Sequence, residues 1–311
     1  MADWLLILIV VLSSLLGLFL IWFFINGIIF FNVSFRRRKD DAHFAENEDP
    51  RAKKEEDRVW YFSHNIEELS LKSYDHLNLK GYLLNQKSNK LAVLIHGYHG
   101  RYYSVVKQAH IFFDNGYDVL SINNRCHDTS EGRYFSMGKK EAKDVDSWIK
   151  LMLQKNPNYQ IVIYGISMGG HIAMLSASSK SVNQNVKCVI EDCCYNSLKE
   201  QLIYILKMKP FRTPRLIVGA AEIYTSIFYH FSYSNTLKKA LKNLKIPALL
   251  IHGGKDNYVP TFNINLNYDS IPKNIYKEKH IFEDSNHTRS VVDNKEKYRE
   301  IVDNFVNKFV K

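Results

Sequence analysis

The stretch that decides the fold is QIVIYGISMGGHIAMLSAS, residues 160–178. It opens with a short apolar run typical of a buried strand and ends in a segment with helical character. Between the two stands GISMGG (residues 165–170), a G-x-S-x-G motif. In this context the motif predicts a sharp turn that holds Ser167 in a strained conformation with its hydroxyl exposed. Glycines are needed at Gly165 and Gly169 because a Cβ there would collide with the neighbouring strand and helix.

Strands and helices alternate on both sides of this turn. Apolar periodicity predicts strands at 69–74, 77–84, 91–95, 117–122, 160–164, 186–191, 248–252 and 276–282, and helices at 105–115, 139–154, 170–178 and 291–310. The first two strands alternate apolar and polar residues, as an antiparallel pair does. The remainder predicts an α/β fold, with a mostly parallel sheet of about eight strands flanked by helices.

Residues 195–244 break this alternation. The segment is far longer than a simple crossover and is rich in apolar and aromatic residues. We interpret it as a lid insertion of two or three helices above the strand ends. The alternative is a set of helices that only pack on the core.

A second glycine-containing turn, HGYHG (residues 96–100), follows the strand at 91–95. With the G-x-S-x-G turn, it resembles the α/β-hydrolase family, and the resemblance covers about residues 66–310. In that family the residue after the His-Gly pair and the residue after the nucleophile donate backbone N–H groups to an oxyanion hole. The resemblance assigns these roles to Tyr98 and Met168. Each such donor can stabilise the transition state by about 3 kcal/mol.

The family orders its catalytic residues as serine, then Asp or Glu, then histidine. Among twelve histidines, His287 lies just past the last predicted strand and before the closing helix, where the base is expected. His171 is four residues after Ser167 on the same helix, so it points along that helix. His96 and His252 each end a strand before a glycine, and we expect both to be structural.

The acid is expected at Asp256, which follows the predicted strand at 248–252. A carboxylate at this strand end can reach the imidazole and fix its tautomer. Asp192, which follows the preceding strand, is the main alternative, because some α/β hydrolases carry the acid there. Asp284 lies too close to the histidine in sequence.

Two further segments bear on the resemblance. NRCHDTSEG (residues 124–132) resembles the family's R-G-x-G-x-S-x-G loop, but Cys126 and Asp128 stand where glycine is usual. This departure puts the local loop shape in question, but not the catalytic set. EDCCY (residues 191–195) resembles a segment of members tethered to membranes by one N-terminal span.

The N-terminal segment is strongly apolar. Residues 5–31 contain three polar residues and no charge, and they outnumber the roughly 20 residues that cross a bilayer as a helix. The run is too long for the apolar core of a signal peptide, and no basic region precedes it. We therefore predict a transmembrane anchor at 1–35. Basic residues 36–39 follow the span, whereas Asp3 and the terminal amine precede it, which predicts a single-pass protein with its catalytic domain on the cytoplasmic side.

The segment after the anchor, residues 36–60, is predicted to be a charged linker, because its few apolar residues cannot form a core. The hydrolase domain is then expected at 61–311. The chain has no C-x-x-C pair, and its four cysteines are expected to be buried free thiols in a reducing compartment. A single long-range bridge from Cys126 is the alternative. The cysteines are Cys126, Cys188, Cys193 and Cys194.

The chain of 311 residues carries a formal net charge of +10. No zinc-ligand spacing or RNA-binding motif accompanies this charge, so we expect no nucleic-acid partner and interpret the charge partly as attraction to anionic lipid headgroups. The triad chemistry requires no metal or organic cofactor.

The predicted function is a serine hydrolase that cleaves small-molecule or lipid-derived acyl esters, or thioesters, through an acyl-enzyme on Ser167. A serine peptidase or amidase with the same triad, and a non-catalytic protein with the hydrolase fold, are the alternatives. Neither the acyl chain length nor the oligomeric state follows from the residues.

Overall fold

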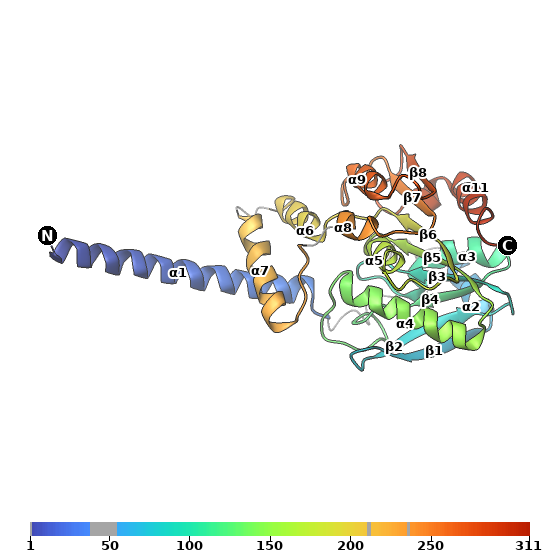
Figure 1. Ribbon diagram of the computed structural model, residues 1–311, viewed down its shortest axis with the longest axis horizontal. Helices are drawn as coiled ribbons and strands as arrows, with labels where there is room; N and C mark the ends of the chain where they lie inside the picture. The colour runs from blue at the N-terminus through green and yellow to red at the C-terminus, as the bar shows by residue number, and fades with distance from the viewer. Residues whose placement is uncertain (1, 38–54, 210–212, 235–236) are drawn as a thin grey trace. The chain divides into compact units, whose positions relative to one another are not determined.

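A computed structural model describes residues 2–37, 55–209, 213–234 and 237–311. Most of the predicted linker, residues 38–54, therefore lies outside the described residues. The chain divides into two compact units (Figure 1). One comprises Met1–Arg36 and Leu198–Asn235, and the other comprises Arg37–Ser197 and Thr236–Lys311.

The second unit is built on an eight-stranded sheet. Its strands are β1 (Ile66–Lys72), β2 (Asn78–Leu84), β3 (Lys90–Ile95), β4 (Asp118–Ile122), β5 (Gln160–Ile166), β6 (Val186–Asp192), β7 (Ala248–Gly253) and β8 (Lys277–Phe282). They lie in the order β1-β2-β4-β3-β5-β6-β7-β8. The β1–β2 and β2–β4 pairs are antiparallel, and the other pairs are parallel. The mostly parallel sheet with an antiparallel edge is confirmed.

Helices cover both faces of the sheet, as the alternation of strands and helices requires. The helices α2 (Glu55–Ser63), α3 (Val106–Asp114), α10 (Ser290–Asp293) and α11 (Lys295–Val306) share one apolar core with alternate residues of the central strands. The opposite face carries α4 (Lys139–Lys155), α5 (Met168–Ala177), α8 (Leu237–Leu241) and α9 (Phe262–Ser270). The central strands are buried on both faces, which explains their continuous apolar runs.

Two local features differ from the sequence-based picture. The single closing helix predicted at 291–310 is two helices, because Asn294 leaves the helical conformation and its side-chain amide donates to Ser285 Oγ at 3.1 Å. Helix α2 runs across the predicted boundary at residue 60, and Tyr61 within it is fully buried in the core.

The first unit contains α1 (Ala2–Ser34), α6 (Leu198–Lys207) and α7 (Pro214–Phe228). Residues Asp3–Ser34 of α1 are long and apolar enough to cross a membrane. Helices α6 and α7 come from the predicted lid segment, and α7 packs against α1 (Figure 1). A position of this segment above the strand ends stays a prediction.

Candidate active site

The turn between β5 and α5 places Ser167 at the end of a central strand. Its backbone has φ 57° and ψ −118°, a conformation that is costly for a residue with a side chain. An added Cβ at Gly165 would lie 2.0 Å from Gly169 O, and one at Gly169 would lie 2.1 Å from Ile95 O. The expected need for glycine at both positions is therefore confirmed. The Ser167 N–H donates to Asp192 O at 2.7 Å, which fixes the turn against β6.

The structure brings together the three side chains that the sequence singled out. His287 Nε2 lies 2.9 Å from Ser167 Oγ, and His287 Nδ1 lies 2.6 Å from Asp256 Oδ2. Asp256 follows β7 and His287 follows β8, so each side chain comes from a loop at the carboxyl end of a parallel strand. Both distances are within hydrogen-bonding range, as a nucleophile, a base and an orienting acid require.

The two predicted oxyanion donors belong to segments that adjoin Ser167. Met168 is the first residue of α5, so its N–H has no acceptor within the helix. A Cβ added at Gly97 would lie 3.3 Å from Ser167 Cβ and 3.8 Å from Ser167 Oγ. The HGYHG turn therefore passes directly against the nucleophile, and Tyr98 is the next residue in that turn.

Comparisons with known proteins agree with this geometry. A family model described as serine aminopeptidase, S33, matches residues 86–208, which include the Ser167 turn. The chain therefore has the α/β-hydrolase fold. It is similar to "Uncharacterized protein YqkD" of Bacillus subtilis (strain 168), with 27% identity over 235 residues that cover 74% of this chain and 75% of that protein.

Two solved structures are similar in fold to this chain. The esterase Pf2001 of Pyrococcus furiosus superposes with a TM-score of 0.68 at 20% identity, over 81% of this chain and 96% of the esterase. The acylaminoacyl peptidase of Pyrococcus horikoshii superposes with a TM-score of 0.59 at 18% identity, over 82% of this chain and 44% of the peptidase. Their names thus include both an esterase and a peptidase on one fold.

The carboxylate of Asp256 is held on both of its oxygens. Asp256 Oδ1 accepts hydrogen bonds from the backbone N–H groups of Tyr258 (2.9 Å) and Val259 (2.8 Å). Asp256 Oδ2 faces His287 and also lies 3.3 Å from His252 Nε2. Burial alone would raise the pKa of the Asp256 carboxyl, but hydrogen bonds from His252 and His287 outweigh it and hold that pKa well below its ordinary value. The carboxylate therefore stays ionised beside the imidazole.

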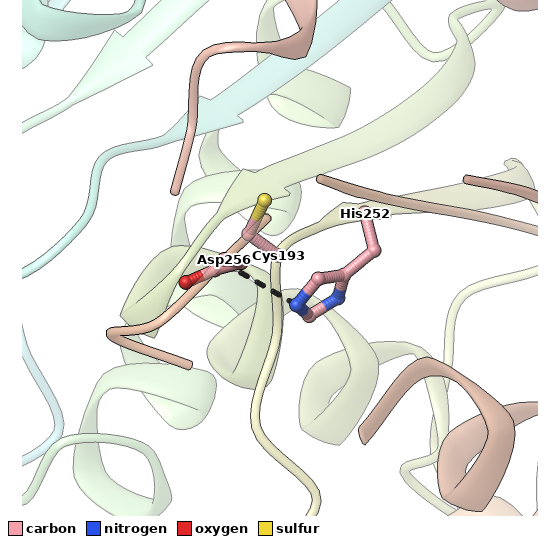
Figure 2. A group of neighbouring side chains, drawn as sticks. All are labelled: Cys193, His252 and Asp256. Carbon is pink, nitrogen blue, oxygen red and sulfur yellow. Dashed lines mark ion pairs between the residues drawn. The ribbon is translucent and has the colours of Figure 1, made fainter. Parts of the chain in front are cut away.

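Sequence reasoning missed the contact between His252 and Asp256. Figure 2 shows the two side chains as an ion pair with Cys193 beside them. His252 was expected to be structural, and its Nε2 indeed donates to Val259 O at 2.9 Å. The sequence signal that could have predicted this contact is the spacing of four residues between His252 and Asp256, across the turn after β7.

The trio Cys193, His252 and Asp256 brings three potential metal ligands within 4.8 Å of one another. A cysteine binds a metal as its thiolate. Burial raises the pKa of the Cys193 thiol well above its ordinary value, and the nearby Asp192 and Asp256 carboxylates raise it further. Asp256 already contacts two imidazoles, those of His252 and His287. We therefore interpret Cys193 and His252 as the buried surroundings of the Asp256 carboxylate.

The two other carboxylates considered as the catalytic acid, Asp192 and Asp284, contact other groups. Asp192 is fully buried behind the turn, where its Oδ2 accepts the hydroxyls of Tyr164 (3.1 Å) and Tyr298 (2.8 Å). Asp284 has a side chain that is 88% exposed and pairs with Lys255 at 2.7 Å. The imidazole that faces Ser167 instead contacts Asp256, at 2.6 Å.

Two other histidines, His171 and His96, have structural partners, a role that the sequence predicted for His96. His171 Nδ1 lies 3.0 Å from Tyr195 O, and its ring stacks on the Tyr195 ring. Burial lowers the pKa of His171 to about 4, so this imidazole is neutral at physiological pH. His96 Nδ1 lies 2.7 Å from Gly97 O, and His96 Nε2 accepts the N–H of Asn124 at 3.1 Å.

The loop at residues 124–132 keeps glycine-like conformations without the glycines. Cys126 has φ 66° and Asp128 has φ 46°, both in the left-handed region that favours glycine. Asp128 Oδ2 accepts the side-chain amide of Asn123 at 2.9 Å, which supports this loop from within. The four cysteines, all within the described residues, are free and buried, as the sequence predicted.

Proposed function

We propose that this α/β hydrolase is a membrane-anchored serine esterase that transfers acyl groups to Ser167 and then to water. The observation that carries the proposal is the continuous contact from Asp256 through His287 to Ser167 Oγ, at 2.6 Å and 2.9 Å. Within this proposal Ser167 is the nucleophile, His287 the general base and acid, and Asp256 the group that orients the imidazole.

Each step of the proposed mechanism uses these residues. Ser167 Oγ attacks the acyl carbonyl carbon while His287 Nε2 takes the hydroxyl proton. The N–H groups of Tyr98 and Met168 stabilise the negative oxygen that forms. The bond to the leaving alcohol then breaks, and the alcohol takes the proton from Nε2. Water attacks the acyl-enzyme with His287 as base, which releases the acid and returns the proton to Ser167.

Esters are the proposed substrates, and peptides or amides are the second candidate. Similarity to an esterase and the long apolar N-terminal helix favour acyl esters, including lipid-derived ones and thioesters. The match to a family model described as serine aminopeptidase favours peptides or amides as the second candidate. A chromogenic panel of p-nitrophenyl esters, thioesters and aminoacyl p-nitroanilides separates the two. The proposal expects higher kcat/KM on the esters, and preferential cleavage of the anilides would support the second candidate.

We also propose that α1 is a permanent span with the catalytic unit on the cytoplasmic side. The basic run at residues 36–39 favours this orientation. Protease treatment of membrane vesicles tests it. The catalytic unit should be digested in inside-out vesicles and protected in right-side-out vesicles, and release of the unit by a carbonate wash would contradict anchoring.

A further inference from the structure

The part of α1 that is exposed on all sides has the length of a bilayer core. From residue 3 to residue 22 the side chains are exposed, and Gly17 has open space around it. Twenty helical residues at 1.5 Å each span about 30 Å, which is the thickness of the hydrocarbon layer. The remaining turns of α1 therefore lie at the membrane surface if the bare part fills the bilayer.

Protein covers one face of α1 from the next turn onward, and α7 provides the cover, whereas the apolar side chains on the other face stay exposed. Gly27 is buried, and a Cβ added to it would lie 2.8 Å from both the carbonyl carbon and the Cβ of Ala220. The two backbones therefore meet at this point, and α7 crosses α1 near its C-terminal end (Figure 1). One turn further along, the Phe31 ring stacks on Tyr229 with centroids 4.4 Å apart and meets the Tyr224 ring edge-on at 5.3 Å.

Helix α7 carries an exposed apolar stripe next to the point where the bare part of α1 ends. Leu216, Ile223 and Ile227 occupy one face of α7 and are 42%, 44% and 58% exposed. With Phe23 they line a hollow of about 550 Å³. Phe23 lies one turn before Gly27, toward the bare end of α1. The stripe therefore lies next to the part of α1 that a bilayer would surround.

Positive charge accompanies the stripe. Residues 198–235 contain five basic and two acidic residues. Lys199 and Arg215 line the same hollow as the stripe, and the Arg215 side chain is 66% exposed. Lys199 is paired with Glu222 at 2.8 Å. Within the described residues, Arg215 has a longer contact of 3.5 Å with Glu200, whose side chain is itself 58% exposed. An exposed cation beside an apolar stripe fits the phosphate layer of an anionic membrane.

We propose that α7 is an interfacial helix, with the stripe of Leu216, Ile223 and Ile227 in the acyl layer of an anionic phospholipid bilayer and Arg215 at the lipid phosphates. The inference rests on the proposed anchoring by α1. It deepens the proposed function, because a bilayer-seated helix that is continuous in sequence with the catalytic unit favours esters that partition into lipid over esters dissolved in water.

The depth of α7 is the direct test. The full chain carries Ile223→Cys or Ile227→Cys, each spin-labelled, in vesicles of phosphatidylglycerol and phosphatidylcholine. The native cysteines are buried and leave the engineered thiol as the accessible one. We expect labels about 5–10 Å below the phosphates, accessible to oxygen and shielded from a water-soluble nickel complex. Lys150→Cys on α4, at an exposed position, is the aqueous control.

The outcomes separate this inference from the proposed anchoring. Leu12→Cys, in the bare part of α1, should be shielded from nickel if α1 spans the bilayer. Nickel access at Ile223 and Ile227 equal to that at Lys150, with Leu12 shielded, overturns the interfacial helix and leaves the anchor intact. Nickel access at Leu12 overturns the anchor itself.

A kinetic test covers the case in which labels disturb the helix. The double variant Ile223→Glu with Ile227→Glu should hydrolyse a long-chain ester in anionic vesicles at least about tenfold more slowly, the factor that a loss of about 1.4 kcal/mol of interfacial binding gives. Its rate on a water-soluble acetyl ester should not change, which also shows that it folds. Gln154→Glu with Asn304→Glu, at exposed positions of α4 and α11, is the control for added charge. Equal loss on both esters, or no loss on the lipid ester, contradicts the proposal.

Discussion

Replacing the proposed acid by its amide, Asp256→Asn, should leave the fold intact and reverse the tautomer of His287. In the structure Asp256 Oδ1 accepts two backbone N–H groups, those of Tyr258 and Val259. The amide oxygen of an asparagine must therefore remain at this position, since an NH₂ group there would face two donors. Its NH₂ group then points at His287 Nδ1 across the gap that measures 2.6 Å in the native protein.

The size of the effect follows from this geometry. A donor at that position forces His287 Nδ1 to accept, which moves the imidazole proton to Nε2, the atom 2.9 Å from Ser167 Oγ. A protonated Nε2 cannot take the serine proton, so kcat should fall by about 10⁴, which is a barrier increase of about 5 kcal/mol. The KM for a short p-nitrophenyl ester should change little, because the carboxylate is buried behind the imidazole.

The assay is steady-state hydrolysis of p-nitrophenyl butyrate by the full chain in detergent, with thermal unfolding as the test of folding. Asp284→Asn is the matched control, because Asp284 is exposed and precedes His287 by three residues. It should keep kcat within about twofold of the native value. A folded Asp256→Asn variant that retains a tenth or more of the native kcat refutes the role of Asp256, and a large loss in Asp192→Asn instead would transfer that role.

Three further predictions concern the surroundings of the site. Gly169→Ala should abolish esterase activity and destabilise the protein by about 3 kcal/mol or more in thermal unfolding, because its Cβ would lie 2.1 Å from a backbone carbonyl oxygen. The control is Gly219→Ala on α7, which has open space around it and should be neutral or stabilising by up to about 1 kcal/mol. Equal effects of the two substitutions would contradict this account. Burial raises the pKa of Glu191 to about 8, so the contribution of this group to stability is present at low pH and is lost as the pH rises toward 8, by at most about 1.4 kcal/mol per pH unit. Glu191→Gln should flatten this dependence of unfolding free energy on pH in denaturant titrations between pH 5 and 8. An unchanged slope would contradict the raised pKa. His252→Leu should lower kcat about tenfold without changing KM, since it removes a hydrogen bond to the charged Asp256. His252→Gln should restore part of the lost kcat. A change in KM instead of kcat would show that His252 does not act through Asp256.

The sequence predicted most of the sheet-bearing unit because its signals are local. Each strand is a short apolar run next to a turn, and the turn at Ser167 needs glycines whose purpose can be derived from sterics alone. The order Ser167, Asp256, His287 came from the resemblance to the α/β hydrolases, and the three side chains can meet because the ends of parallel strands share one edge of a sheet. The structure places these three side chains in contact.

Features that depend on distant contacts could not be derived in this way. The approach of His252 to Asp256 depends on how the chain returns after β7. The crossing of α1 by α7 at Gly27 depends on an encounter between residues nearly 200 positions apart. The break at Asn294 is set by a side-chain hydrogen bond to another loop, which competes with helix propensity.

Covalent capture of the nucleophile tests the central claim most directly. The native full chain should react with a fluorophosphonate probe in a 1:1 ratio, and peptide mass mapping should place the adduct on Ser167. Labelling should disappear in Ser167→Ala and after heat denaturation, because it requires the activated hydroxyl beside His287. An adduct that persists in Ser167→Ala, or a folded native chain that cleaves esters without forming the adduct, would contradict the account.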